Sequence, residues 1–185
     1  SFTSLGPQPL NGQNGWISAG RTNVLATDPT DTAVAYFGSA GGGVWKTTNC
    51  CSAATTWTPA TDDPLLQTIA IGEIELDPND SQTVYAGTGD LRYGSWSFGA
   101  AGLLKSTDSG ATWALLGADV FSGAYPQPPG GFPQYQAIGQ VEVDPRDSDN
   151  LVVGTKTGLF LSYDGGANWT GPCFTNAFSS QRQDV

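Results

Sequence analysis

The carboxylate side chains are the groups in this sequence best suited to catalysis or metal binding. Glu75 and Glu142 hold the same place in two similar segments, Ile74-Glu75-Leu76-Asp77-Pro78 and Val141-Glu142-Val143-Asp144-Pro145. Two carboxyl groups can act as general acid and general base. Equivalence within a repeat is better explained by structure, because a strand turns every second side chain to the same side. We therefore interpret both glutamates as solvated or hydrogen-bonded strand residues.

Metal and triad chemistry find little support. Asp144, Asp147 and Asp149 are crowded enough to suggest calcium, whose ligands are oxygens. Turn capping is our preferred interpretation, since one repeat alone has this crowding. The chain has no His, which removes Ser-His-Asp and Cys-His catalysis and the commonest zinc ligand. We expect neither a metal site nor a cofactor.

Composition points to a domain made of short strands. The 185 residues include 25 Gly and 12 Pro, with aromatic and β-branched residues between them. No apolar run has the length of a membrane helix. The net charge of -10 argues against nucleic acid as a partner, and seven Lys plus Arg are too few for an anionic membrane surface.

The three cysteines and the acidic, Lys-poor composition suit an exported protein, either extracellular or periplasmic. The sequence begins at Ser1 without a Met or a signal segment, so we expect a mature, processed polypeptide. Cys50 and Cys51 are adjacent, and Cys173 lies far along the chain. A bridge between the adjacent pair and bonds to another chain are both open. We expect an inert structural role rather than redox chemistry.

Two copies of one turn, Ser-x-Asp-x-Gly-x-x-Trp, organise the chain. In such a turn the Ser and Asp side chains hydrogen-bond to the turn's own backbone, Gly supplies a positive φ, and Trp covers the turn. A third, degenerate copy from Thr47 to Trp57 has Asn49 in place of Asp, about three extra residues and no Gly. The residues of the two full copies are Ser106, Asp108, Gly110 and Trp113, and Ser162, Asp164, Gly166 and Trp169.

The turns belong to a longer repeat, whose Trp residues recur about every 56 positions. Each repeat predicts four strands: an inner one that ends at Asp-Pro, a second, a third that leads into the turn, and an outermost one that begins at the Trp. The inner strands are expected within 21–29, 70–78 and 137–145, the second at 33–38, 83–87 and 150–154, and the third at 43–47, 102–106 and 158–162. We divide the chain into a lead-in or closing strand (1–16), repeat one (17–62), repeat two (63–119), an insertion (120–136), repeat three (137–178) and the start of a fourth inner strand (179–185).

These turns resemble the Asp-box (BNR) repeat of the sialidase, xyloglucanase and sortilin-like β-propellers. The resemblance implies an all-β fold, a β-propeller of four-stranded antiparallel blades, with about three blades in this chain. Propellers generally have four to eight blades, so we expect part of a larger ring of six to eight. A companion chain, remaining blades or another copy of this chain would complete it.

The resemblance gives weak support for catalysis. In the xyloglucan-active propellers a catalytic Asp precedes a Gly-Gly pair in the first blade, whereas this sequence has Ala40 at that position, in Ser39-Ala40-Gly41-Gly42-Gly43. Glycoside hydrolysis depends on such a carboxyl group. Sialidases use an Arg cluster for the substrate carboxylate, and only Arg21 is well placed here. The other arginines are Arg92, Arg146 and Arg182.

Two insertions carry the remaining functional signal, because exposed aromatic rings beside polar groups suit sugars or protein partners. The alternative is that these rings fold inward and cover a blade edge. The aromatics are Tyr93, Trp96 and Phe98 in the first insertion, and Tyr125, Phe132 and Tyr135 in or beside the second. We predict a ligand-binding face made of Arg21, Asp90, Arg92, Tyr93 and Trp96.

We therefore expect a secreted module that binds a polysaccharide, a glycan or a protein. The first alternative is a polysaccharide-active glycoside hydrolase, xyloglucanase-like or sialidase-like, whose catalytic carboxylates lie mostly outside these residues. The second alternative is a purely structural subunit of an extracellular assembly.

Overall fold

The structure is a computed structural model. It describes residues 10–11, 17–18, 21–62, 66, 68, 70–91, 98–125 and 134–173.

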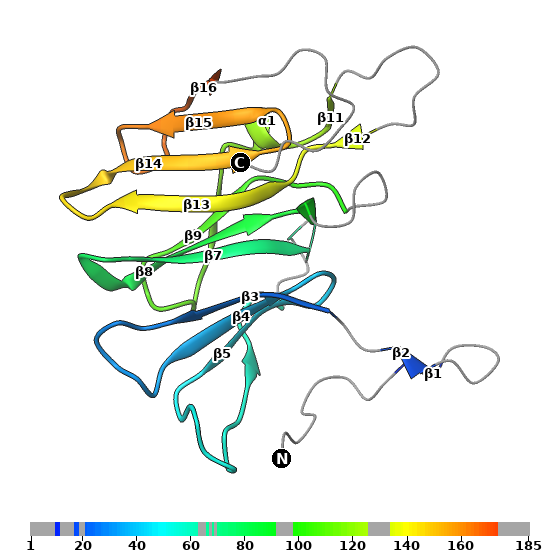
Figure 1. The fold of residues 1–185 in the computed structure, drawn as a ribbon, viewed down its shortest axis with the longest axis vertical. Helices are drawn as coiled ribbons and strands as arrows, with labels where there is room; N and C mark the ends of the chain where they lie inside the picture. Colours follow the sequence, from blue (N-terminus) through cyan, green and yellow to red (C-terminus); the bar gives the residue numbers. More distant parts are fainter. Residues whose placement is uncertain are drawn as a thin grey trace.

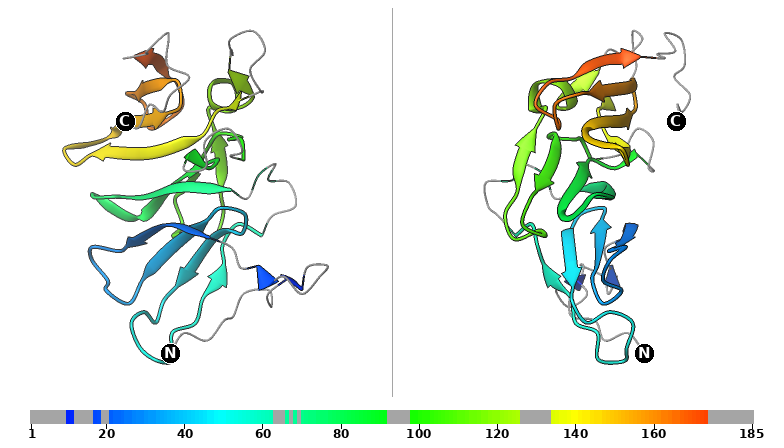
Figure 2. Two further views of the ribbon diagram at one scale, coloured as in Figure 1. Left: turned by 45° about the vertical axis from the view of Figure 1, so that its right-hand side comes forward. Right: turned by 90° about the vertical axis from the view of Figure 1, so that its left-hand side faces the viewer.

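Three four-stranded antiparallel sheets dominate the fold, and each has its strands side by side in chain order. We call them blades 1, 2 and 3. Figures 1 and 2 show them stacked one above another along the long axis of the molecule. Blade 1 contains β3 (Thr22–Thr27), β4 (Ala35–Ser39), β5 (Gly43–Thr47) and β6 (Thr58–Pro59). Blade 2 contains β7 (Ile71–Asp77), β8 (Asp80–Thr88), β9 (Leu103–Ser106) and β10 (Ala114–Leu116). Blade 3 contains β13 (Ile138–Asp144), β14 (Asp147–Thr155), β15 (Gly158–Ser162) and β16 (Thr170–Cys173).

This architecture confirms the prediction of an all-β fold with about three propeller blades. The remaining described elements are short. They are the hairpins β1 (Leu10–Asn11) with β2 (Ile17–Ser18) and β11 (Ala124–Tyr125) with β12 (Gln134–Tyr135), and the helix α1 (Ala118–Phe121).

The Asp-Pro pairs make the tight turns between the first two strands of each blade. The Oδ1 atom of Asp77 accepts a hydrogen bond of 2.8 Å from the Asn79 amide, and Asp144 accepts one of 2.9 Å from the Arg146 amide. Pro follows each of these Asp residues and fixes a backbone angle that suits the turn. Asp28 makes the corresponding bond, of 2.7 Å, in blade 1. These turns lie at the left of the sheets in Figure 1.

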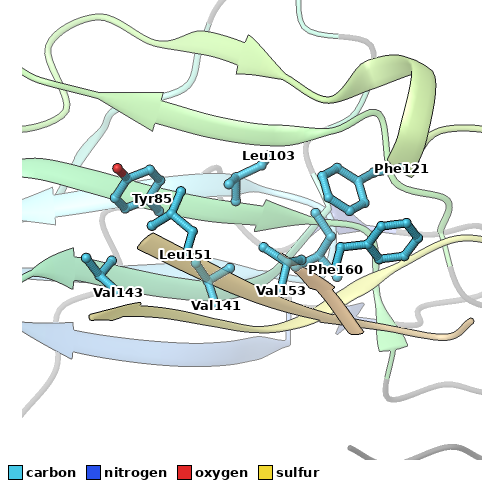
Figure 3. Packing of buried hydrophobic residues seen from close by; sticks show 9 residues of the cluster. Tyr85, Leu103, Phe121, Val141, Val143, Leu151, Val153 and Phe160 are labelled. Atoms are coloured by element: carbon cyan, nitrogen blue, oxygen red, sulfur yellow. The ribbon is translucent and has the colours of Figure 1, made fainter. Parts of the chain in front are cut away.

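Blades pack face to face through apolar residues that alternate along their strands. Tyr36 and Val44 of blade 1 belong to one core cluster with Ile74, Leu104 and other residues of blade 2. A second cluster fills the space between blades 2 and 3, where the side chains of Tyr85, Leu103 and Phe121 meet those of blade 3 (Figure 3). The blade 3 members are Ile138, Val141, Val143, Leu151, Val153 and Phe160.

The repeated turn has the hydrogen bonds expected from its sequence. The Oγ atom of Ser106 accepts the Gly110 amide at 2.8 Å and donates to Asp108 at 2.8 Å. Asp108 also accepts the Thr112 hydroxyl at 2.6 Å and the Thr112 amide at 2.8 Å, and these bonds, with the one from Ser106, hold the pKa of the Asp108 carboxyl at about 2. Gly110 has a φ of 85°, and a Cβ atom there would lie 3.3 Å from the ring of Tyr36 and 3.4 Å from the ring of Trp113. The second copy has the same bonds: Ser162 accepts the Gly166 amide and donates to Asp164, and Asp164 accepts the Asn168 amide.

The degenerate turn of blade 1 keeps this scheme despite its extra residues. Thr47 and Asn49 share a bond of 3.0 Å, and Asn49 accepts the amide of Thr56 at 2.9 Å. The structure joins Cys50 and Cys51 in a disulfide, one of the two alternatives that the sequence left open. Cys51 has a φ of 75° and therefore takes the place of Gly110.

Candidate functional site

The loops that follow the second strand of each blade meet at one end of the sheets, opposite the Asp-Pro turns. In Figure 1 this end lies at the right. We call it the loop rim and define it as Arg21 together with residues 40–42, 89–91, 98–102, 134–137 and 156–157. Propeller ligands generally bind to loops of this kind, because loops carry function on a rigid scaffold.

An ion pair across the rim joins blade 1 to blade 2. The guanidinium of Arg21 donates to the carboxylate of Asp90, which is buried. Arg21 also donates through Nε to Asn23 at 2.9 Å, and Asn23 donates to the carbonyl oxygen of Ile71 at 2.8 Å. The sequence predicted that Arg21 and Asp90 share a site, and the structure brings them together.

Lys156 of blade 3 adds a second cation near Asp90. Burial lowers the pKa of the Lys156 ammonium, and the negative charge of Asp90 opposes that shift. The Asp90 carboxylate therefore interacts with two cations, Arg21 of blade 1 and Lys156 of blade 3. Sequence reasoning missed Lys156, although it follows Thr155 directly, just as Gly89-Asp90 follows Thr88 at the equivalent end of blade 2.

Aromatic rings are exposed on the same rim. Phe98 is 61% exposed and Tyr135 is 47% exposed. Gly99, the residue after Phe98, packs against Tyr135: a Cβ atom added at Gly99 would lie 3.0 Å from the Cβ of Tyr135. The carbonyl oxygen of Phe98 accepts the Asp90 amide at 2.9 Å, so this aromatic pair is tied to the ion pair.

Gln136, the residue after Tyr135, contributes a buried amide to the rim. Gln136 donates from Nε2 to the hydroxyl of Thr157 at 2.6 Å. Its Oε1 atom is buried and has no hydrogen-bond partner within the described part of the chain. The rim therefore presents exposed aromatic rings and the 40% exposed side chain of Arg21 over a buried carboxylate and a buried amide, and the exposed groups suit a polar ligand with flat apolar faces.

The remaining predicted ligand residues, Arg92, Tyr93 and Trp96, lie outside the described residues. So do Phe132 and the side chain of Tyr125.

Glu75 and Glu142 differ in their surroundings. Burial raises the pKa of Glu75 to about 7, with further increases from the negative charges of Glu142, Glu73 and Asp77. Glu142 is exposed and accepts a hydrogen bond of 2.9 Å from Gln140. Glu75 can therefore hold a proton near neutral pH, which is the property required of a general acid.

The acidic residues around the turn between β13 and β14 make local contacts. Asp144 pairs with Arg146 at 3.0 Å, and Asp147 accepts the Asp149 amide at 3.2 Å. No group of three or more His, Cys, Asp or Glu side chains among the described residues is arranged to hold a metal ion. In the same part of the chain, no helix has the length and apolarity needed to cross a membrane.

Ala40 lies on the rim beside Arg21, whose carbonyl oxygen accepts the Ala40 amide at 2.8 Å. This is the position where the family resemblance would place a catalytic Asp. The neighbouring Ser39 hydroxyl is buried and has no hydrogen-bond partner among the described residues.

The chain is similar in sequence to a xyloglucanase and in fold to enzymes of GH74. No protein-family model matches it. A xyloglucanase of Hypocrea jecorina (strain QM6a) is 30% identical over 148 residues, which make up 77% of this chain and 16% of that protein. The chain thus spans a small part of this curated relative.

Solved structures of GH74 enzymes share the fold. An ancestral GH74 enzyme has a TM-score of 0.57 at 20% identity, and the match covers 82% of this chain and 18% of the enzyme's chain. The GH74 xyloglucanase from Xanthomonas campestris has a TM-score of 0.54 at 24% identity, covering 82% and 20%. The Niastella koreensis GH74 enzyme has a TM-score of 0.53 at 21% identity, covering 85% and 23%.

Proposed function

We propose that this chain is the polysaccharide-binding part of an extracellular Asp-box β-propeller of the xyloglucanase type. The observation that carries the proposal is the 30% identity to the Hypocrea jecorina xyloglucanase over 77% of the chain. The loop rim supports it with chemistry, since it places exposed Phe98 and Tyr135 beside the Arg21–Asp90 pair. Sugar rings stack on aromatic faces while their hydroxyl groups bond to charged and amide groups.

Binding suits the described rim better than hydrolysis. Glycoside hydrolysis uses two carboxyl groups on either side of the scissile bond. The rim has Ala40 where the resemblance would place the first of them. Asp90 is buried and bound to Arg21, so its carboxylate is committed to joining two blades.

Binding is tested by calorimetry of the whole chain with xyloglucan, an unbranched β-1,4-glucan and a mannan. We expect xyloglucan to bind, and Phe98→Ala and Tyr135→Ala to weaken binding about tenfold each, as expected for the loss of a stacking contact. The matched control is Tyr163→Ala, which removes a 67% exposed ring at the opposite end of the sheets. Equal affinity of all three variants would overturn the rim as the binding site.

The second candidate function is hydrolysis, with Glu75 as the proton donor. The observation in its favour is the pKa of Glu75, which burial and neighbouring negative charges raise to about 7. Reducing ends should be measured in the calorimetry samples, for the natural chain and for Glu75→Gln. Release by the natural chain and its loss in the variant would support hydrolysis. Binding without any release would reject it, and a chain that neither binds nor cleaves would be a structural subunit.

A further inference from the structure

Asp90 lies at the loop rim but presents almost no surface to the solvent. It is 3% exposed, whereas Phe98 and Tyr135 on the same rim are 61% and 47% exposed. A side chain this buried has little surface for a ligand to touch, so a part in binding must act through its neighbours. Burial of a carboxylate is also unfavourable unless cations and hydrogen-bond donors surround it. The contacts of Asp90 therefore show what its charge holds in place.

Cations of the two neighbouring blades interact with the Asp90 carboxylate. The guanidinium of Arg21, directly before β3 of blade 1, donates a hydrogen bond to it. Burial lowers the pKa of the Lys156 ammonium of blade 3, and the negative charge of Asp90 raises it. Asp90 itself follows β8 of blade 2. One buried carboxylate thus connects all three blades at the same end of the sheets.

The backbone of Asp90 is bonded to the segments that carry the exposed rings. Its amide donates a hydrogen bond of 2.9 Å to the carbonyl oxygen of Phe98. Two residues further along, the amide of Ala100 donates one of 2.7 Å to the carbonyl oxygen of Gln136, which follows Tyr135. The segment of Phe98 therefore joins Asp90 to the segment of Tyr135, and the placement of both rings depends on the placement of Asp90.

Close packing on both sides leaves the Asp90 segment little room to shift. Before it, a Cβ atom added at Gly89 would lie 2.8 Å from the Cα of Ala137. After it, the side chain of Leu91 covers Gly139 of β13, where an added Cβ atom would lie 2.2 Å from the Cδ2 of Leu91. A displacement of Asp90 would therefore also move the backbone that holds the rings.

We propose that Asp90 is a positioning residue for ligand binding, whose carboxylate, held by the cations of blades 1 and 3, sets the place of the Phe98 ring relative to the Tyr135 ring. A rim that holds its rings in the bound arrangement before the ligand arrives loses less conformational entropy on binding. The effect on affinity rests on the proposed function of the rim as a polysaccharide-binding surface. The placement of the rings does not, so it has a test of its own.

The first test is calorimetry of the whole chain and its Asp90→Asn variant with xyloglucan. The variant keeps the size of the side chain but loses its charge, and we expect the affinity to fall about tenfold. The matched control is Asp77→Asn. Asp77 is also 3% exposed and accepts a hydrogen bond of 2.9 Å from Ser148 of blade 3, but at the Asp-Pro end of the sheets. The control should lower stability and leave the affinity unchanged. Equal losses of affinity in both variants, or none in Asp90→Asn, would overturn the proposal.

A double-mutant cycle shows whether Asp90 acts through Phe98. In the Phe98→Ala background, Asp90→Asn should lower the affinity by less than about threefold, because the ring that Asp90 positions is already absent. The same loss in that background as in the natural chain would overturn the positioning role, since Asp90 would then affect the ligand by another route.

Amide hydrogen exchange, followed by NMR without ligand, tests the placement of the rings by itself. In Asp90→Asn the amides of position 90 and Ala100 should exchange at least about tenfold faster, because their bonds to the Phe98 and Gln136 carbonyl oxygens open more often. Asp77→Asn should leave both rates unchanged.

The two readouts separate this inference from the proposed function. A chain that binds no glycan but shows the faster exchange would reject the proposed function and support the role of Asp90 in placing the rings. Unchanged exchange would reject that role whatever the chain binds. Arg21→Gln alters a side chain that is 40% exposed and removes one of the two cations, so it gives the exchange readout even if Asp90→Asn does not fold.

Discussion

The ammonium group of Lys105 in blade 2 donates a hydrogen bond of 3.1 Å to the carbonyl oxygen of Gly165 in blade 3. The same ammonium lies 5.3 Å from the ring centre of Tyr85. Lys46 repeats both contacts one blade earlier, with Ser109 and Tyr36. Each Ser-x-Asp-x-Gly-x-x-Trp turn therefore presents a backbone carbonyl to the blade before it, so the turn also connects neighbouring blades.

Replacing Lys105 by Met should lower the free energy of unfolding by about 1 kcal/mol, because a hydrogen bond and a cation–π contact are lost while the apolar stem is kept. Chemical denaturation of the natural chain and the variant measures the change. Arg146→Met is the control. Its side chain is 86% exposed and pairs with Asp144 alone among the described residues, so we expect a smaller loss of stability than for Lys105→Met. Equal effects of the two changes would argue against the Lys105 contact.

Ser109→Gly should stabilise the protein by about 0.5 kcal/mol. Ser109 has a φ of 58°, and Gly165 holds the equivalent position with a φ of 68°. An L-residue resists this conformation, and the relief exceeds the entropy that glycine adds to the unfolded chain. Thr107→Gly changes an exposed residue of the same turn without a positive φ and should destabilise. Thermal denaturation of both variants decides the sign, and a lower melting temperature for Ser109→Gly would refute the expectation.

The two turn tryptophans should respond differently to replacement by Phe. Trp113 donates from Nε1 to the carbonyl oxygen of Ala60 at 2.9 Å, whereas the Nε1 of Trp169 has no partner among the described residues. Trp113→Phe should therefore cost about 1 kcal/mol more than Trp169→Phe. Trp113→Ala should cost about 3 kcal/mol, since it also leaves a cavity. Urea denaturation measures all three, and no loss in the alanine variant would contradict the packing role.

Glu75→Gln should raise stability above neutral pH. The pKa of Glu75 is raised to about 7 in the folded protein, so the folded state holds this proton more tightly than the unfolded state does. The free energy of folding that comes from binding this proton is fully present at low pH. It is lost as the pH rises through the folded-state pKa of about 7. Because the group is partly solvated, we expect a gain of about 1 kcal/mol in the variant at pH 8 and none at pH 4.

Unfolding curves at both pH values provide the check on Glu75. Glu142→Gln gives an independent readout, because it removes a negative charge that raises the pKa of Glu75. In that variant the Glu75 midpoint, followed by NMR, should move to lower pH. A constant difference between Glu75→Gln and the natural chain at every pH would show that the carboxyl group is not perturbed.

The sequence predicted the blades well because their signals are local. Asp-Pro pairs and the Ser-x-Asp-x-Gly-x-x-Trp turns mark strand ends by bonding within a few residues, as Asp77 and Ser106 do. Strand alternation then assigns Ile74 to a buried face and Glu75 to the other side. No contact between blades was needed to reach the fold class.

The site was less predictable because its contacts run between blades. Arg21 and Asp90 were placed together from their repeat positions, and the structure joins them. Lys156 was missed because its relation to Asp90 depends on how blade 3 packs against blade 2. The equivalence of Cys51 and Gly110 was also hidden, because a cysteine gives no signal of the positive φ that it shares with that glycine.

The turn of blade 1 shows that the motif tolerates a change in length. Its Thr47, Asn49 and Thr56 reproduce the bonds of a shorter turn, and the extra residues add bonds of their own, from the Asn49 amide group to the Ala54 carbonyl oxygen and from the Ala54 amide to Ser52. Ala53 and Ala54 are exposed in this segment. Foreign peptides, such as an epitope tag or a fluorophore attachment sequence, could be grafted there at the end of the sheets away from the loop rim, so the protein can be labelled without touching its candidate ligand face.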